Sequence, residues 1–187
     1  MGEIHTGATL TPSFRDFLPA WVTSQDWYDG HGALRPTGFF RFEDPAGQVG
    51  VETHLLRDGE TVWQVPLTYR PAPLAGGALV ATAEHSVLGT RWIYDAVTDP
   101  VWIAAITDLV ATGGVAHRAA RSGFGPVEVR GTLIRPTQKP VMIDLHRRIV
   151  PDGPAEDAVG VVTGSWHQDG SVRTGRLAVI RQTGPKT

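Results

Sequence analysis

The sequence predicts an α+β protein with a largely antiparallel sheet and about two helices. Its 22 glycines and 14 prolines fall between short apolar runs and do not gather in one linker. That distribution is typical of many short strands joined by turns. The joins between strands are hairpin-like, and the regular strand–helix alternation of a parallel sheet is missing.

The first helix is expected within "TLTPSFRDFLPAW", residues 9–21. Thr11 is suited to cap it and Pro12 to occupy its first position, where a missing N–H costs nothing. Phe14, Phe17 and Leu18 recur at the spacing of one helical face.

A second helix is expected within "TDPVWIAAITDLVATGG", residues 98–114. Asp99 is a good N-cap, Pro100 suits the first turn, and the pair Gly113-Gly114 ends the helix. One face carries the apolar residues at helical spacing: Trp102, Ala105, Ile106 and Leu109.

About eight strands account for most of the remainder. Asp58-Gly59 and Asp169-Gly170 each lie between two strand segments and provide the positive φ angles of a two-residue hairpin turn. Pro66 and Pro71 would interrupt a central strand, so edge or bulge positions are expected for them. The segments are 38–44, 48–57, 60–70, 77–88, 127–135, 140–150, 158–166 and 172–181, with 90–96 as a strand end before the second helix.

The best linker candidate is "VAHRAARSGFGP", residues 115–126. It separates an N-terminal region, 1–114, from a C-terminal antiparallel β region, 127–187. At this length the two are expected to pack together as one compact unit.

Composition excludes several function classes. The chain has no cysteine, which rules out disulfides, thiol nucleophiles and cysteine-ligated metals. A net charge of −2 offers no general attraction for nucleic acid, and no apolar run approaches a membrane span. The first residues lack the features of a secretory signal, so a cytoplasmic location is expected.

No catalytic motif is present, and we expect no catalytic residue, cofactor or metal. Phosphate-binding and dinucleotide-binding glycine loops, the nucleophile elbow and the zinc-protease helix motif are all missing. Ser165, His167 and Asp169 alternate along one strand, so their side chains lie side by side and cannot converge as a triad.

Two acidic–histidine pairs raise a metal hypothesis, Glu52 with His54 and Asp144 with His146. Each pair could give two ligands, but nothing predicts a third. A solvated polar strand face is the favoured alternative. Arg147 interrupts the apolar row of this last strand and is expected near its rim.

The first candidate binding feature is "SQDWYDGHG", residues 24–32, which places Trp27 and Tyr28 in a glycine-rich loop. Scaffold-held loops often carry function, and aromatic faces beside charged groups suit sugars or peptides. The alternative is that Trp27 closes one end of the core while Asp29-Gly30 turns the chain.

A second candidate is a polar corner where a strand passes into the second helix. His85, Arg91, Tyr94 and Asp95 flank it and could line a cleft. Arg91 and Asp95 could instead form a structural pair, and Trp92 and Ile93 are expected in the core.

In order along the chain, four segments resemble the N-terminal cap of bacterial maltokinases, and more closely actinobacterial stand-alone cap-like proteins. The resemblance covers residues 10–113, and the end of the chain is similar to the close of the stand-alone proteins. The segments are "FLPAWVTSQDWYDGHG", "WQVPLTYR", "HSVLG" and "RWIYDAVTDP".

The resemblance implies a curved, cystatin-like antiparallel sheet with packed helices and no phosphate-binding residues. Maltokinases phosphorylate maltose from ATP, but their catalytic lobes have no counterpart in this sequence. When the C-terminal strand is laid on their nucleotide lobe, Asp144 stands at the position of a lysine. Kinase activity is therefore not expected. Some relatives are labelled 1,4-α-glucan branching proteins, yet branching uses a large barrel that this length cannot hold.

Three functions follow from these observations. The favoured one is a non-catalytic binding or regulatory protein, whose partner is an enzyme of trehalose, maltose or α-glucan metabolism, or whose ligand is a small sugar. The second is a small enzyme with an acid–base cleft near His85, Arg91, Tyr94 and Asp95, in which His146 could also take part. The third is a homodimer formed through an exposed sheet edge.

Overall fold

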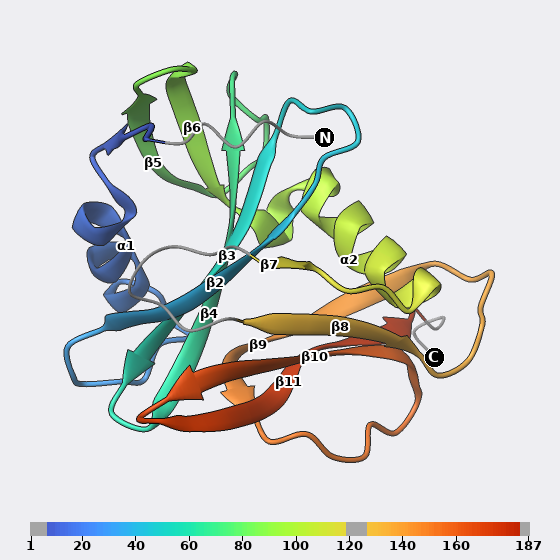
Figure 1. The fold of residues 1–187 in the computed structure, drawn as a ribbon. Helices are drawn as coiled ribbons and strands as arrows, with labels where there is room; N and C mark the ends of the chain where they lie inside the picture. Colours follow the sequence, from blue (N-terminus) through green and yellow to red (C-terminus); the bar gives the residue numbers. More distant parts are fainter. Residues whose placement is uncertain (1–6, 119–126, 184–187) are drawn as a thin grey trace.

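The computed structural model describes residues 7–118 and 127–183. Every strand pair in this part of the chain is antiparallel, so the predicted α+β class with a largely antiparallel sheet is confirmed (Figure 1). The helices are α1 (Phe14–Thr23), η1 (Ala96–Thr98) and α2 (Pro100–Thr112). The strands are β1 (Leu10–Thr11), β2 (Arg35–Phe42), β3 (Gly50–Asp58), β4 (Thr61–Arg70), β5 (Leu79–His85), β6 (Gly89–Asp95), β7 (His117–Arg118), β8 (Glu128–Leu133), β9 (Val141–Val150), β10 (Ala158–Gln168) and β11 (Ser171–Gln182).

The strands form two sheets that meet at one place. The first has the order β1-β5-β6-β4-β3-β2-β7, and the second has the order β9-β11-β10-β8. They join where β9 pairs with β4 at Arg148 and Trp63. The described strands do not close into a barrel.

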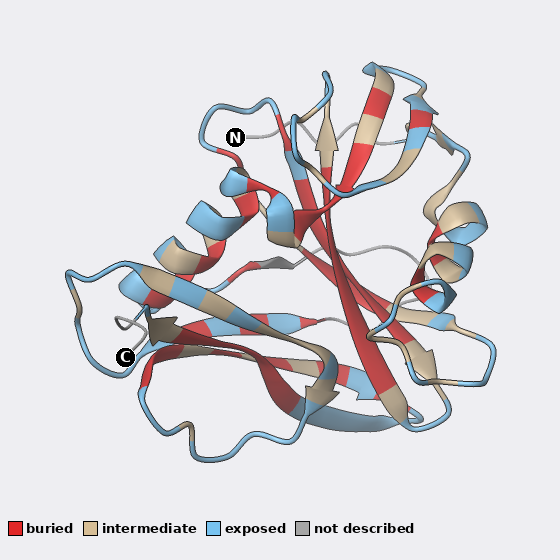
Figure 2. Ribbon diagram, turned by 180° about the vertical axis from the view of Figure 1, so that it is seen from behind, coloured by how far each residue is buried: buried red, intermediate tan, exposed pale blue. Residues whose placement is uncertain are grey.

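The central strands β3 and β4 are buried on both faces (Figure 2). Successive residues of a strand point to opposite faces, so Leu55 packs into one core cluster and Leu56 into the other. The cluster around Leu56 includes Leu18 and Val22 of α1. The cluster around Leu55 is larger and includes α2 and the second sheet, with Trp102, Ile106, Val162, Leu177 and Ile180.

The two predicted regions share this larger core. Of the expected linker, Val115 bridges to Arg130 of β8, and residues 117–118 form β7. The rest of it, residues 119–126, lies outside the described residues.

Local signals placed α2 correctly. The carboxylate of Asp99 accepts from the Val101 N–H, and Gly113 ends the helix with φ 63°. The start of α1 was predicted two residues too early. Ser13 is its N-cap, and its N–H donates to the Asp16 carboxylate, while Pro12 precedes the cap. The capping box from Ser13 to Asp16 is the stronger signal.

Both predicted hairpins form, although one turn is shifted. Asp169 and Gly170 have positive φ and connect β10 to β11 as predicted. Between β3 and β4 the turn residues are Gly59 and Glu60, because Asp58 still pairs with Thr61. Only Gly59 has positive φ there, which is the pattern of a type II′ turn.

The expectation that Pro66 lies at an edge or bulge was wrong, since it lies inside the central strand β4. On one side it pairs with Thr53 of β3. On the other side β6 pairs with residues 67–70 and β9 only with Trp63. Residues 64–66 therefore face a gap between two partner strands, where the missing N–H of a proline breaks no ladder bond.

Gln64 joins the two sheets across this gap. Its side-chain nitrogen donates to the carbonyl oxygens of His146 in β9, at 2.8 Å, and Leu177 in β11, at 2.6 Å. The side chain is fully buried. One amide group thus satisfies two carbonyls at the irregularity where β9 bulges away from β11 and pairs with β4.

Replacing Gln64 with leucine should lower the free energy of unfolding by about 1–3 kcal/mol, because both carbonyls lose their donor in a buried place. Urea unfolding measures this. Gln48→Leu is the matched control: that residue is exposed, and a change within about 0.5 kcal/mol is expected. Equal effects of both substitutions would show that Gln64 does not join the sheets.

Candidate functional site

The aromatic loop after α1 packs against the first sheet. Trp27 and Tyr28 are half-buried on the cluster that contains α1. The ring of Trp63 in β4 lies beneath them, with centroids 6.0 Å from Trp27 and 5.0 Å from Tyr28. Trp21 of α1 lies 6.0 Å from Trp27 on another side. These contacts hold the loop against the sheet and leave part of each ring at the surface.

Asp58, at the end of β3, fastens this loop. Its carboxylate accepts from the Tyr28 hydroxyl at 3.1 Å and from the N–H groups of His31 and Gly32 at 3.0 and 2.9 Å. The hydrogen bond from Gly32 is the largest of the effects that hold the pKa of Asp58 below its ordinary value. Partial burial and the neighbouring carboxylate raise the pKa of Tyr28.

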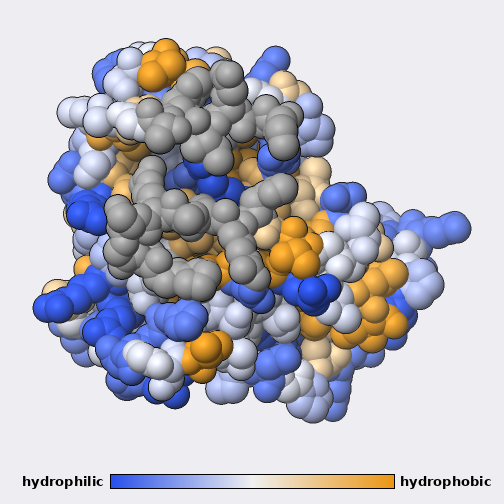
Figure 3. Space-filling view, in the orientation of Figure 1, coloured by the Kyte–Doolittle hydropathy of each residue, from blue (hydrophilic) through white to orange (hydrophobic). Residues whose placement is uncertain are grey.

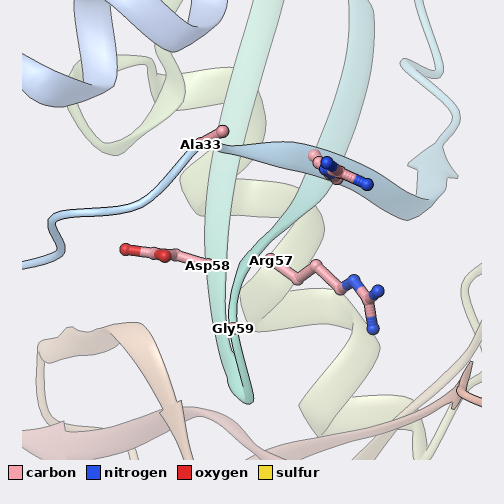
Figure 4. Close-up of a pocket in the computed structure, with 5 residues that line it drawn as sticks. Ala33, Arg57, Asp58 and Gly59 are labelled. Carbon is pink, nitrogen blue, oxygen red and sulfur yellow. The ribbon is translucent and has the colours of Figure 1, made fainter.

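Figure 4 shows the hairpin that carries Asp58, beside an open groove of about 270 Å³. Asp58 and Arg57 project to opposite sides of this hairpin (Figure 4). Arg57 donates to both carboxylate oxygens of Asp169 in the β10–β11 turn, at 2.8 and 2.7 Å. The two hairpin turns and the aromatic loop thus meet at one end of the molecule.

Replacing Asp58 with alanine should release the aromatic loop, because three donors lose one shared acceptor. Amide hydrogen exchange of His31 and Gly32 is expected to become faster, whereas Asp29→Ala, which changes an exposed carboxylate of the same loop, should leave it unchanged. Since the pKa of Asp58 is lowered on folding, this protection is present at neutral pH and is lost as the pH falls through that lowered value. Unchanged exchange in the Asp58 variant would contradict the anchoring role.

The four residues of the predicted polar corner separate into two places. His85 and Arg91 lie at the β5–β6 hairpin. The His85 Nδ1 accepts from the N–H groups of Val87 and Leu88, at 3.2 and 3.1 Å, and Arg91 donates to the Leu88 carbonyl at 2.8 Å. Both side chains therefore shape this turn.

Tyr94 and Asp95 lie at the other end of β6. The buried Tyr94 hydroxyl accepts from the Leu74 N–H at 2.8 Å. Asp95 is also buried, caps η1 through the Val97 N–H, and forms an ion pair with Arg147. The partner of Asp95 is thus Arg147, and Arg91 points instead to the hairpin.

Arg147 connects the two predicted features. From β9 its guanidinium reaches Asp95, and its Cζ lies 4.7 Å from the centre of the Trp27 ring. Its Nη1 is buried with no hydrogen-bond partner among the described residues. The sequence predicted a position near the rim of the sheet for this residue. One feature of the sequence could have indicated the ion pair. A charged residue interrupts the apolar row Val141, Ile143, Leu145 and Ile149, and a charge on a buried face requires a partner of opposite charge.

Two acid–base groups of the second hypothesis lie apart, because His85 ends β5 beside the β5–β6 hairpin and Asp95 is at the far end of β6. Burial lowers the pKa of His146, whose Nδ1 has no partner in the described part of the chain. His85 holds a turn and Asp95 holds Arg147, so both are engaged by the fold. The two grooves at the hairpin end are lined by other residues.

The Glu52–His54 pair is buried, which corrects the expectation of a solvated face. Phe14 of α1 packs on the His54 ring at 4.8 Å and covers this face of the sheet. Glu52 pairs with Arg41 at 2.6 Å, and the His54 Nε2 lies 3.0 Å from the Tyr69 hydroxyl. Over residues 7–118 and 127–183, no three His, Asp or Glu side chains are grouped to hold a metal ion.

These elements define an antiparallel α+β module in which a helix-covered sheet carries an anchored aromatic loop. Residues 21–99 match the family model of the maltokinase N-terminal cap domain. This region of the chain is thus similar to the maltokinase N-terminal cap domain, as the resemblance predicted. The match spans the loop, β2 to β6 and η1. No curated protein matches the chain. Among the described helices, none is long and apolar enough to cross a bilayer.

Proposed function

We propose that this protein is a non-catalytic binding or regulatory module that docks on an enzyme of trehalose, maltose or α-glucan metabolism. The cap-domain match over residues 21–99 carries the proposal. The match supports a role in which the module binds a carbohydrate-converting enzyme and does not itself convert a substrate.

The use of the polar groups supports recognition over catalysis. His85, Arg91, Tyr94 and Asp95 are each engaged in a turn, a cap or an ion pair. A general acid or base must be able to reach a substrate proton, and these groups are directed to their own chain.

Exposed apolar side chains support a protein partner over a sugar ligand. Leu133 and Ile134, where β8 ends, are both exposed, as is Val115 beside the end of α2. Figure 3 shows apolar surface on this side of the molecule. Adjacent exposed apolar groups are a common feature of protein-binding surfaces.

The test is binding of the purified chain to purified maltokinase and the other enzymes of that route, measured by interferometry, with calorimetry against maltose, trehalose and maltodextrins. We expect saturable binding to one enzyme, weakened by Ile134→Asp and unchanged by the control Val172→Asp, which alters an exposed apolar residue at the opposite end of the second sheet. Absence of binding to every enzyme and every sugar would contradict the proposal.

A further inference from the structure

A second groove lies at the junction of the cap-like region and the C-terminal sheet. It is beside the β3–β4 and β10–β11 hairpins, whose ribbons are at the lower left of Figure 1. Its volume is about 350 Å³, within the range of small-molecule sites. One wall is the start of β4, another is the end of β9, and the third is the β10–β11 hairpin. Its lining is Glu60, Thr61, Val62, Arg148, Ile149, Val150, Pro151, Trp166, Gln168, Arg173 and Thr174.

Gln168, which lines this groove, carries a buried hydrogen-bond donor without a partner in the described structure. The Trp166 indole N–H donates to Gln168 Oε1 at 3.3 Å, which fixes the orientation of the amide. Gln168 Nε2 has no partner in the described structure, although Gln168 is only 4% exposed. A buried amide nitrogen without an acceptor costs free energy, and an acceptor atom of a ligand would remove that cost.

Two arginines stand at the rim of the groove. Arg173 faces Glu60 and Arg148 faces Asp29, each at 3.6 Å, and all four side chains are more than half exposed. Contacts of this length between exposed groups are weak and exchange readily with solvent. Both guanidiniums are therefore able to turn toward an anion in the groove, where charge-assisted hydrogen bonds are stronger.

We infer that this groove binds a small carboxylic acid with an apolar body. The carboxylate lies between Arg148 and Arg173 and accepts from Gln168 Nε2 once that buried amide turns toward the groove. The apolar body rests on the hydrophobic wall formed by Val62, Ile149, Val150, Pro151 and Trp166. This goes beyond the proposed function, because it concerns an acidic small molecule and a surface other than the end of β8.

The test is a titration of the full, ¹⁵N-labelled chain with sodium benzoate, followed by NMR of the Gln168 side-chain amide and the Trp166 indole N–H. We expect both signals to move saturably, with a dissociation constant of roughly millimolar order for so small a ligand. Benzamide, which keeps the ring and loses the charge, should bind at least about fivefold more weakly.

Variants at the rim keep the test independent of folding, because the substituted side chains are exposed. Arg148→Gln with Arg173→Gln should weaken benzoate binding by about tenfold. The control Arg130→Gln, which removes an exposed charge of β8, should leave it unchanged. Gln168 and Trp166 signals that stay still, equal binding of benzamide, or equal effects of the rim and control variants would each overturn the inference. Loss of enzyme binding in the interferometry experiment would leave these signals unaffected.

Discussion

Replacing Asp99 with alanine is expected to lower the free energy of unfolding by about 3–5 kcal/mol, because it removes the cap of α2 and leaves the partly buried Arg70 without its bidentate partner. Asp99 is fully buried at the start of α2. Its carboxylate accepts from Arg70 Nε at 2.6 Å, Arg70 Nη2 at 2.7 Å and the Thr68 hydroxyl at 2.7 Å. It also caps α2 through the Val101 N–H at 2.9 Å. One residue thus fastens the helix to β4.

Urea unfolding measures the effect, and Asp108→Ala is its control, since Asp108 is an exposed acid on the same helix. The control should change stability by no more than about 0.5 kcal/mol. Adding Arg70→Met to the Asp99 variant should recover part of the loss, because the unpaired cation is then removed as well. A loss no larger than that of the control would contradict the role of Asp99.

The pH dependence of this contribution follows from the pKa of Asp99. Burial alone would raise that pKa from 3.8, but the hydrogen bonds from Arg70, Thr68 and Val101 together outweigh burial and lower it. Because the pKa of Asp99 is lower in the folded state than in the unfolded state, its contribution to stability is complete above the unfolded-state pKa. That contribution is lost as the pH falls through the folded-state pKa. Acid should therefore destabilise the native protein more than the Asp99 variant.

Replacing Arg147 with methionine is the second substitution with a large expected effect, a loss of about 2–4 kcal/mol that reflects a buried but not fully enclosed ion pair. Asp95 keeps only its cap of η1, and Trp27 loses the cation over its ring. The near-ultraviolet circular dichroism of the tryptophans should change with it, since the packing around Trp27 is altered.

The adjacent residue offers the control for this experiment. Arg148 is more than half exposed and contacts Asp29 at 3.6 Å, so Arg148→Met should cost less than about 1 kcal/mol. Equal losses from both substitutions, or an unchanged tryptophan signal in the Arg147 variant, would show that Arg147 does not link the corner to the loop.

The parts of the fold that depend on neighbours in sequence were predictable. The cap Asp99, the terminating Gly113 and the Asp169-Gly170 turn act over a few residues, so the residues themselves indicate them. Pro66 was misjudged because its environment depends on where two other strands end. The burial of Glu52 and His54 depends on α1 covering that face, which a strand pattern does not contain.

The candidate site was predicted only as separate pieces. Trp27 and Asp95 were singled out, but what connects them is Arg147, 52 residues beyond Asp95. The groove at the sheet junction was not predicted. Gln168 and Arg173 line it only because the β10–β11 hairpin lies beside β9 and the start of β4 in the folded chain. These contacts join residues that are far apart in the sequence, so the spacing of residues along the chain does not predict them.

We propose that this chain recognises a partner and carries out no phosphate transfer itself. A time course of the purified chain with ATP, magnesium and maltose, followed by ³¹P NMR, tests it most directly. We expect the three ATP signals to stay as they are in the protein-free blank. Growth of a sugar-phosphate signal together with ADP, in proportion to the amount of chain added, would contradict the claim.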